Sequence, residues 1–138
     1  MLLAGKIILV SGGTRGLGAG IARAAAAHGA TGIMITGRGR AAGEAFAAEL
    51  AGNGTDTRFH AVDLADPLAA AGSVTAAVAS YGGVDCVVNS AGITTRGTLL
   101  DTTVELFDAH IAINLRAPFS SCRRPWTICG VVRRPDRS

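Results

Sequence analysis

A glycine-rich run in the first part of the chain carries the strongest chemical signal. It has the sequence Ser11-Gly12-Gly13-Thr14-Arg15-Gly16-Leu17-Gly18 and lies between an apolar segment and an Ala-rich one. Its glycines are spaced G-x-x-x-G-x-G rather than as the commoner G-x-G-x-x-G. Such a turn from strand to helix lets backbone N–H groups approach a pyrophosphate, and the helix N-terminus adds partial positive charge. A glycine-rich turn of purely steric origin is the alternative. The residues expected to contact a dinucleotide are Gly12, Thr14, Arg15, Gly16, Leu17 and Gly18.

Arginine, and no acid, follows the second apolar segment, in Ile35-Thr36-Gly37-Arg38-Gly39-Arg40. In dinucleotide-binding folds this position faces the adenosine ribose, where an acid binds the 2′-hydroxyl and an arginine accommodates a 2′-phosphate. The guanidinium groups of Arg15 and Arg38 could converge on one phosphate. We therefore expect NADP(H) to be preferred over NAD(H), with two solvated surface arginines as the alternative.

The elements that position these residues follow from hydrophobic patterning. Short β-branched apolar runs alternate with Ala-rich segments of helical length, as in βαβ units with a parallel sheet covered on both faces. The pattern predicts an α/β fold with a Rossmann-like, doubly wound parallel sheet of about four strands in the order 3-2-1-4. The expected strands are Lys6–Val10, Gly32–Thr36, Arg58–Val62 and Val84–Asn89, and the expected helices are Gly16–His28, Ala41–Ala51 and Pro67–Tyr81.

A fourth helix is predicted to begin at Thr102-Thr103-Val104-Glu105, which has the spacing of a capping box. Val104, Phe107, Ile111 and Leu115 then fall on one apolar stripe. Asn114, three residues after Ile111, points near that apolar face, where a buried amide needs hydrogen-bond partners.

Four motifs, in order along residues 6–119, resemble those of the short-chain dehydrogenase/reductase family. The glycine-rich loop is similar to the family's cofactor loop, with Ser11 in place of the usual Thr. Asp63-Leu64 stands where the family places an Asp that contacts the adenine. Asn89-Ser90-Ala91-Gly92 resembles its Asn-Asn-Ala-Gly motif, with Ser90 for the second Asn, and Asn114-Leu115-Arg116-Ala117-Pro118-Phe119 resembles its catalytic-helix segment. Besides the loop and Arg38, the resemblance implies cofactor contacts from Asp63, Leu64, Asn89, Ala91 and Gly92.

Residue chemistry agrees with these roles. Asn89 ends a strand at the edge where open α/β sheets bind ligands, and its amide can tie the loops of neighbouring strands together. In the family, the residue corresponding to Asn114 shapes the helix so that a water joins a proton relay to the active-site lysine. Asp63 as a helix-entry cap and Asn89 as a turn residue are the alternatives.

The resemblance implies hydride transfer between a nicotinamide and a carbonyl or alcohol carbon, with a Tyr, a Lys four residues later and a Ser as catalytic partners. The chain has one tyrosine, Tyr81, and one lysine, Lys6, which cannot form Tyr-x-x-x-Lys. Asp85, four residues after Tyr81, has the wrong charge to lower a phenol pKa. We expect dinucleotide binding without turnover, Asn114 as the one member of the catalytic set, and a small carbonyl or alcohol substrate only in an intact form.

The basic character of the 138-residue chain belongs to its last residues. Residues 1–122 hold 8 Lys or Arg against 9 Asp or Glu, whereas residues 123–138 hold five arginines against Asp136. We predict an incomplete dinucleotide-binding domain over residues 1–121 and an irregular basic tail over 122–138, which a frameshift or truncation near Cys122 would explain. The hypothesis fails if neither alternative reading frame past codon 121 restores a strand, a Ser and Tyr-x-x-x-Lys. Without a fifth strand, the segment Val84–Asn89 would be a bare apolar edge, so we expect the isolated chain to be poorly soluble or to associate obligatorily.

Composition also bears on partners and setting. Cys86, Cys122 and Cys129 form no CxxC pair, which argues against a disulfide framework and a zinc site, so we expect no metal and a cytoplasmic location. No apolar stretch approaches the roughly 18 residues of a membrane span, so no membrane partner is expected.

Two other function classes stay open. The chain could be a non-catalytic NADP-binding or oligomerisation module that forms a homo-oligomer, or pairs with an intact homologue, through its fourth helix. It could also bind nucleic acid through the five arginines and Trp126 of the tail, although the tail has no recognisable module. We do not expect nucleic acid as a partner.

Overall fold

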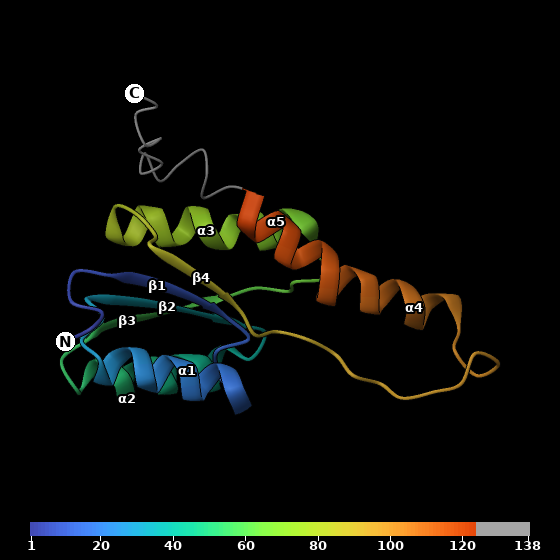
Figure 1. Cartoon of the computed structure of the whole chain (residues 1–138), viewed down its shortest axis with the longest axis horizontal. Coiled ribbons are helices and arrows are strands. Elements are labelled where there is room, and N and C mark those ends of the chain that lie inside the picture. The colour runs from blue at the N-terminus through green and yellow to red at the C-terminus, as the bar shows by residue number, and fades with distance from the viewer. Residues whose placement is uncertain (124–138) are drawn as a thin grey trace, which may run out of the picture.

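The computed structural model describes residues 1–123 and shows one four-stranded parallel sheet between two layers of helices (Figure 1). The strand order is β3-β2-β1-β4, which confirms the predicted order. The strands are β1 (Ile7–Ser11), β2 (Gly32–Gly37), β3 (Asp56–Ala61) and β4 (Cys86–Asn89). The helices are α1 (Gly16–Ala27), α2 (Arg40–Ala51), α3 (Pro67–Tyr81), α4 (Val104–Ile111) and α5 (Ala117–Arg123), and a π-helical turn, η1 (Ala112–Arg116), joins the last two.

The two central strands carry the core because their apolar side chains face helices on both sides. α1 and α2 cover one face of the sheet, and α3 and α5 lie on the other (Figure 1). Val10 and Ile35 pack with Ala22 and Phe46 on the α1 side. Leu9, Met34, Val74 and Ala77 form a second buried cluster on the α3 side.

The outer strands differ from the prediction. They are the two edge strands, as the predicted order 3-2-1-4 requires, but they are only partly buried, whereas strands buried on both faces were expected. β3 begins earlier, at Asp56, because Asp56 pairs with Gly32, the first residue of β2. β4 begins later, at Cys86, and none of its residues is fully buried.

Local signals set the start of α3 as predicted. The Leu68 N–H donates to Asp66 Oδ1 at 2.8 Å, and Pro67 occupies the first helical turn, where its missing N–H costs nothing. The capping box predicted from Thr102 and Glu105 does not form, because the cap lies one residue later. Thr103 is the cap of α4 and accepts from Leu106 N at 3.2 Å, whereas the Thr102 hydroxyl donates to Thr98 O.

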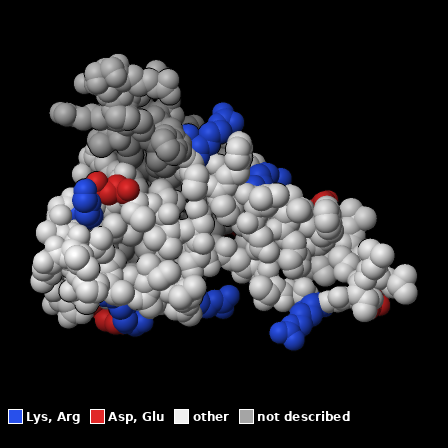
Figure 2. All heavy atoms as spheres, viewed as in Figure 1, with Lys and Arg blue, Asp and Glu red and all other residues white. Residues whose placement is uncertain are grey.

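The predicted single fourth helix is interrupted at η1. Pro118 has no N–H to donate to the carbonyl of Asn114, and its ring crowds that carbonyl, so the turn widens there. The apolar stripe is also far from buried, since Phe107 is 57% exposed and Leu115 62% exposed. α4 projects away from the sheet (Figure 1), and uncharged surface covers most of it (Figure 2). In the part of the chain described by the structure, no helix has both the length and the apolar character needed to cross a bilayer.

Candidate functional site

The loop that follows β1 needs glycine because it packs directly against the loop that follows β4. Gly12 has φ +64, and a Cβ on it would lie 2.7 Å from Ala91 Cα. The Ser90 N–H donates to Ser11 O at 3.2 Å, which joins the two loops through their backbones. The structure therefore brings the Ser11–Gly18 loop and the Asn89–Gly92 motif together at the carboxyl edge of the sheet.

Close packing also explains two further glycines of this loop. A Cβ on Gly13 would lie 2.6 Å from Ile35 Cγ2, and the Gly13 N–H donates to Thr36 O at 3.2 Å. A Cβ on Gly18 would collide with the Gly12 carbonyl oxygen. These contacts hold the start of α1 against the ends of β1 and β2, where a ligand at the sheet edge would lie.

The N-terminus of α1 suits an anion. Its cap residue, Arg15, makes no side-chain cap hydrogen bond, and the first turn contains no acidic residue. Gly16 has φ +54, and a Cβ there would meet no atom within 4 Å. Leu17 is 76% exposed beside it. The first N–H groups of the helix therefore meet no competing side chain, which is the condition for phosphate binding.

Arg15 and Arg38 are both exposed, and within residues 1–123 neither forms an ion pair. Arg40 differs, because its guanidinium lies 3.1 Å from Glu44 on the next turn of α2. A Cβ on Gly37, just before Arg38, would lie 3.3 Å from Thr14 Cγ2, so the ends of β2 and the glycine loop are adjacent. Two arginine side chains without an ion pair within residues 1–123 therefore lie at the edge of this loop.

The turn after β3 has an acidic side chain at its surface. Asp63 is exposed, and its Oδ1 accepts from Ala65 N at 3.0 Å, so Asp63 caps this turn, whereas Asp66 caps α3. Leu64 is 8% exposed and packs with Val62. The side chain of Leu64 supports the turn from inside, and Asp63 is the exposed polar group.

The two asparagines bind neighbours that the sequence did not indicate. Asn89 Nδ2 donates to Cys122 Sγ of α5 at 3.3 Å, so its amide does not tie the loops of neighbouring strands as expected. Asn114 Oδ1 accepts from Ile93 N at 2.9 Å, and its Nδ2 donates to Ile93 O at 2.8 Å. Asn114 is exposed and not buried as predicted, because the π-turn η1 directs it to the loop after β4.

Tyr81 and Lys6 lie at the opposite, amino edge of the sheet. The Tyr81 hydroxyl donates to Ile33 O at 2.9 Å, with Asp56 O at 3.1 Å, and burial raises its pKa to about 12. Lys6 Nζ lies 3.3 Å from Asp85 Oδ1. Both residues hold strand ends together, far from the glycine loop along the strands.

Sequence reasoning also missed Arg116, whose Nη2 donates to Ala65 O at 2.7 Å. No spacing rule connects η1 with the turn after β3, since the two are 51 residues apart. The only candidate signal was a basic residue two positions after Asn114.

The cysteines and the potential metal ligands of the described residues were also located. Cys86 and Cys122 are exposed free thiols, whereas Cys129, Trp126 and the arginines of the tail beyond Arg123 lie outside the described residues. Within residues 1–123, no three His, Cys, Asp or Glu side chains gather as metal ligands.

Several known proteins with similar sequences and folds are described as dehydrogenases or reductases. A D-beta-hydroxybutyrate dehydrogenase of Cupriavidus necator is 40% identical over 124 residues, 88% of this chain and 47% of the relative. Versicolorin reductase 1 of Aspergillus parasiticus is 36% identical over 90% of this chain and 47% of its own length. A short chain dehydrogenase from Burkholderia cenocepacia, solved in complex with NADP, has a TM-score of 0.89 and 36% identity, covering 94% of this chain and 53% of that one.

The chain therefore spans about half the length of these relatives. The family model for short chain dehydrogenases matches residues 6–127, which include all four motifs. The chain belongs to the short-chain dehydrogenase/reductase family.

Proposed function

We propose that this chain binds NADP(H) as the cofactor-binding part of an oxidoreductase. The observation that carries the proposal is the pair of unpaired arginines, Arg15 and Arg38, beside a glycine loop whose helix N-terminus is open to an anion. An acid that would favour the 2′-hydroxyl of NAD(H) is absent from the end of β2. Structures of similar proteins in complex with NADPH or NADP support the same cofactor.

Each part of the site has a role in this proposal. Backbone N–H groups of Gly12–Gly18 hold the pyrophosphate, and Arg15 and Arg38 hold the 2′-phosphate by charge-assisted hydrogen bonds. Asp63 accepts from the adenine amine, and the buried side chain of Leu64 supports the turn that carries Asp63. Asn89, Ala91 and Gly92 flank the nicotinamide end, where Asn114 fixes the loop. Bound NADP(H) would supply the hydride chemistry of the family.

We also propose that the 138-residue chain does not turn over by itself. Its tyrosine and its lysine are engaged at the amino edge of the sheet, where Tyr81 keeps its proton and Lys6 pairs with Asp85. Reduction of a small carbonyl, or oxidation of an alcohol, is proposed only for an intact form with its own Tyr, Lys and Ser.

One assay tests both statements. NADPH fluorescence is followed during titration with the full chain, and the same mixtures are then given simple aldehydes, ketones and alcohols. We expect enhanced or shifted fluorescence on binding and no consumption of NADPH. Turnover by the purified chain would disprove the second statement, and an unchanged spectrum would disprove the first.

A second candidate function is self-association through the apolar stripe, which would make the chain an oligomerisation module. Of the stripe residues, Val104, Phe107 and Leu115 are between 57% and 71% exposed and Ile111 is 40% exposed. Phe119, four residues after Leu115, is 61% exposed and extends the stripe into α5. Exposed apolar side chains in one continuous row are typical of protein interfaces. A second copy of the chain brings an identical apolar row, so the two rows can cover each other about a twofold axis.

The remaining proposals concern setting and organisation. We propose a cytoplasmic location and a dinucleotide-binding unit over residues 1–121 followed by a basic tail. Cys122 and Arg123, which the sequence placed with the tail, continue α5 in the structure. Nucleic-acid binding through the tail would need residues beyond 123, which are outside the described part.

A further inference from the structure

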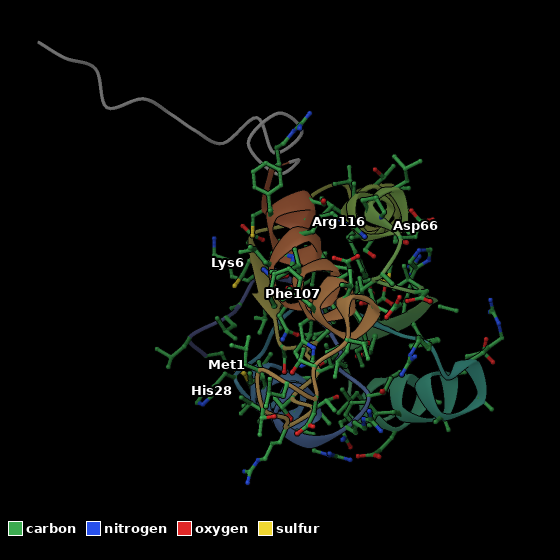
Figure 3. The ribbon with its side chains drawn as sticks, turned by 90° about the vertical axis from the view of Figure 1, so that its right-hand side faces the viewer. Met1, Lys6, His28, Asp66, Phe107 and Arg116 are labelled. Carbon is green, nitrogen blue, oxygen red and sulfur yellow. The ribbon has the colours of Figure 1, made fainter. Side chains whose placement is uncertain are left out.

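The π-turn η1 contacts two separate cofactor loops. Asn114 binds both backbone polar atoms of Ile93, in the loop after β4. Two residues later, Arg116 reaches the turn after β3 and donates to Ala65 O. Figure 3 shows Arg116 on the side of its helix that faces α3, with Asp66 at the start of α3 nearby. A single turn of chain therefore fixes two loops that follow different strands.

Hydrogen bonds hold the backbone of Ala65 through both of its polar groups. Its carbonyl accepts from Arg116 Nη2 at 2.7 Å, and its N–H donates to Asp63 Oδ1 at 3.0 Å. The Asp66 N–H donates to Asp63 O at 3.2 Å and closes the turn. Asp63 Oδ2 has no hydrogen-bond partner within residues 1–123, so one carboxylate oxygen is fixed and the other is free for a ligand.

Packing next to Arg116 strengthens this connection. Ala117 is 2% exposed and lies in one cluster with Val62, Leu64 and Ala70. The start of α5 is thereby seated on the same turn that Arg116 binds. Within residues 1–123, Arg116 is the side chain that donates to Ala65 O, so loss of this charged donor frees the carbonyl and loosens the turn in which Asp63 lies.

We propose that Arg116 is a positioning residue for adenine recognition: by holding Ala65 O, it directs the free oxygen of Asp63 toward the exocyclic amine of the adenine. This inference rests on the proposed binding of NADP(H). It assigns Arg116 no contact with the nicotinamide or with a substrate. The specific consequence is selectivity for a base that carries an amine, because a carboxylate accepts from an amine and is repelled by a carbonyl.

The test compares NADPH with its hypoxanthine analogue, in which a carbonyl replaces the adenine amine. Both ligands carry the same charge, so general electrostatic attraction cancels in their affinity ratio. In the full wild-type chain, we expect NADPH to bind at least about fivefold tighter than the analogue. Arg116→Ala should reduce this ratio to about one by weakening NADPH, with little change for the analogue. Arg116→Lys, which keeps a charged donor, should restore part of the ratio.

Matched controls separate this role from general destabilisation. Arg123→Ala removes the same charge from the end of α5, where Arg123 is exposed and has no hydrogen bond within residues 1–123, and should leave the ratio unchanged. If Arg116→Ala does not fold, Arg116→Met keeps an apolar stem without a donor, and the same loss of ratio is expected. Hydrogen exchange at Ala65 and Asp66 should quicken in the Arg116 variants without any ligand.

The outcomes are distinct. A wild-type ratio in a folded variant that lacks the donor, such as Arg116→Ala, or an equal loss of affinity for both ligands, overturns the positioning role while leaving the proposed function in place. Failure of the wild-type chain to bind either ligand overturns the proposed function and this inference with it.

Discussion

At the scale of single residues, Arg38 is the position at which the proposed cofactor preference can be tested. Arg38→Asp places an acid where the 2′-phosphate is proposed to lie and offers an acceptor to a 2′-hydroxyl instead. We predict that NADPH affinity falls at least about tenfold while NADH affinity is kept or rises. Arg40→Ala is the matched control, because Arg40 is two residues away but paired with Glu44. An equal loss of both cofactors in calorimetric titrations would argue against the assigned role.

Tyr81 predicts a specific pH dependence of stability. Its pKa of about 12 lies above the ordinary value of 10.0, mainly because burial disfavours the phenolate. The folded state therefore holds this proton more tightly than the unfolded state. The contribution of Tyr81 to the free energy of unfolding is fully present below pH 10 and is lost as pH rises toward 12, since the phenol ionises first in the unfolded state.

The measurement is unusually direct because the chain has a single tyrosine. Tyrosinate absorbance should titrate near pH 12 in the folded protein and near 10 in urea. Tyr81→Phe should abolish the decline of unfolding free energy over that interval. An ordinary phenol titration in the folded chain would contradict the buried hydrogen bonds to β2 and β3.

Much of the site could be predicted from residue types, and the exceptions have physical causes. Gly12 and Gly18 were recognisable because a close backbone approach requires glycine, and the structure shows what each would collide with. The partners of Asn89 and the contact of Arg116 with Ala65 could not be predicted. These contacts join segments that are 33 and 51 residues apart along the chain, and only the fold brings such segments together in space.

At the scale of elements, the apolar stripe on α4, η1 and α5 predicts association. Phe107→Glu with Leu115→Glu should shift the chain from dimer to monomer in sedimentation velocity, because two charges would be buried without partners. Leu68→Glu is the control, since Leu68 is 80% exposed in the first turn of α3, outside the stripe. A monomeric wild-type chain, or a dimer that survives both changes, would remove this interface.

Some secondary-structure elements could be predicted from the sequence and others could not. The central strands and α3 were predictable, because apolar runs, Pro67 and the Asp66 cap act locally. The π-turn was not, although Pro118 is visible in the sequence: a proline can end, kink or widen a helix, and tertiary contacts decide among these. The expectation of strands buried on both faces failed at β3 and β4, which are only partly buried, because a low polar content does not show how far the helices cover the outer strands of a sheet.

At the scale of the whole molecule, the residues proposed to bind the cofactor gather at one edge of the sheet. Glycine loop, arginines, Asp63 and Asn114 all lie at or beside the carboxyl edge of one sheet, while Tyr81 and Lys6 stabilise the amino edge. The chain spans about half the length of its relatives, and the function proposed for it is limited to cofactor binding.

The central claim is therefore a preference in binding, and a single measurement tests it most directly. The full wild-type chain is titrated by calorimetry with NADPH and, separately, with NADH under the same conditions. We predict saturable binding of NADPH at least about tenfold tighter than that of NADH, because only NADPH offers a phosphate to Arg15 and Arg38. Equal or tighter binding of NADH, or no heat with either cofactor, would contradict it.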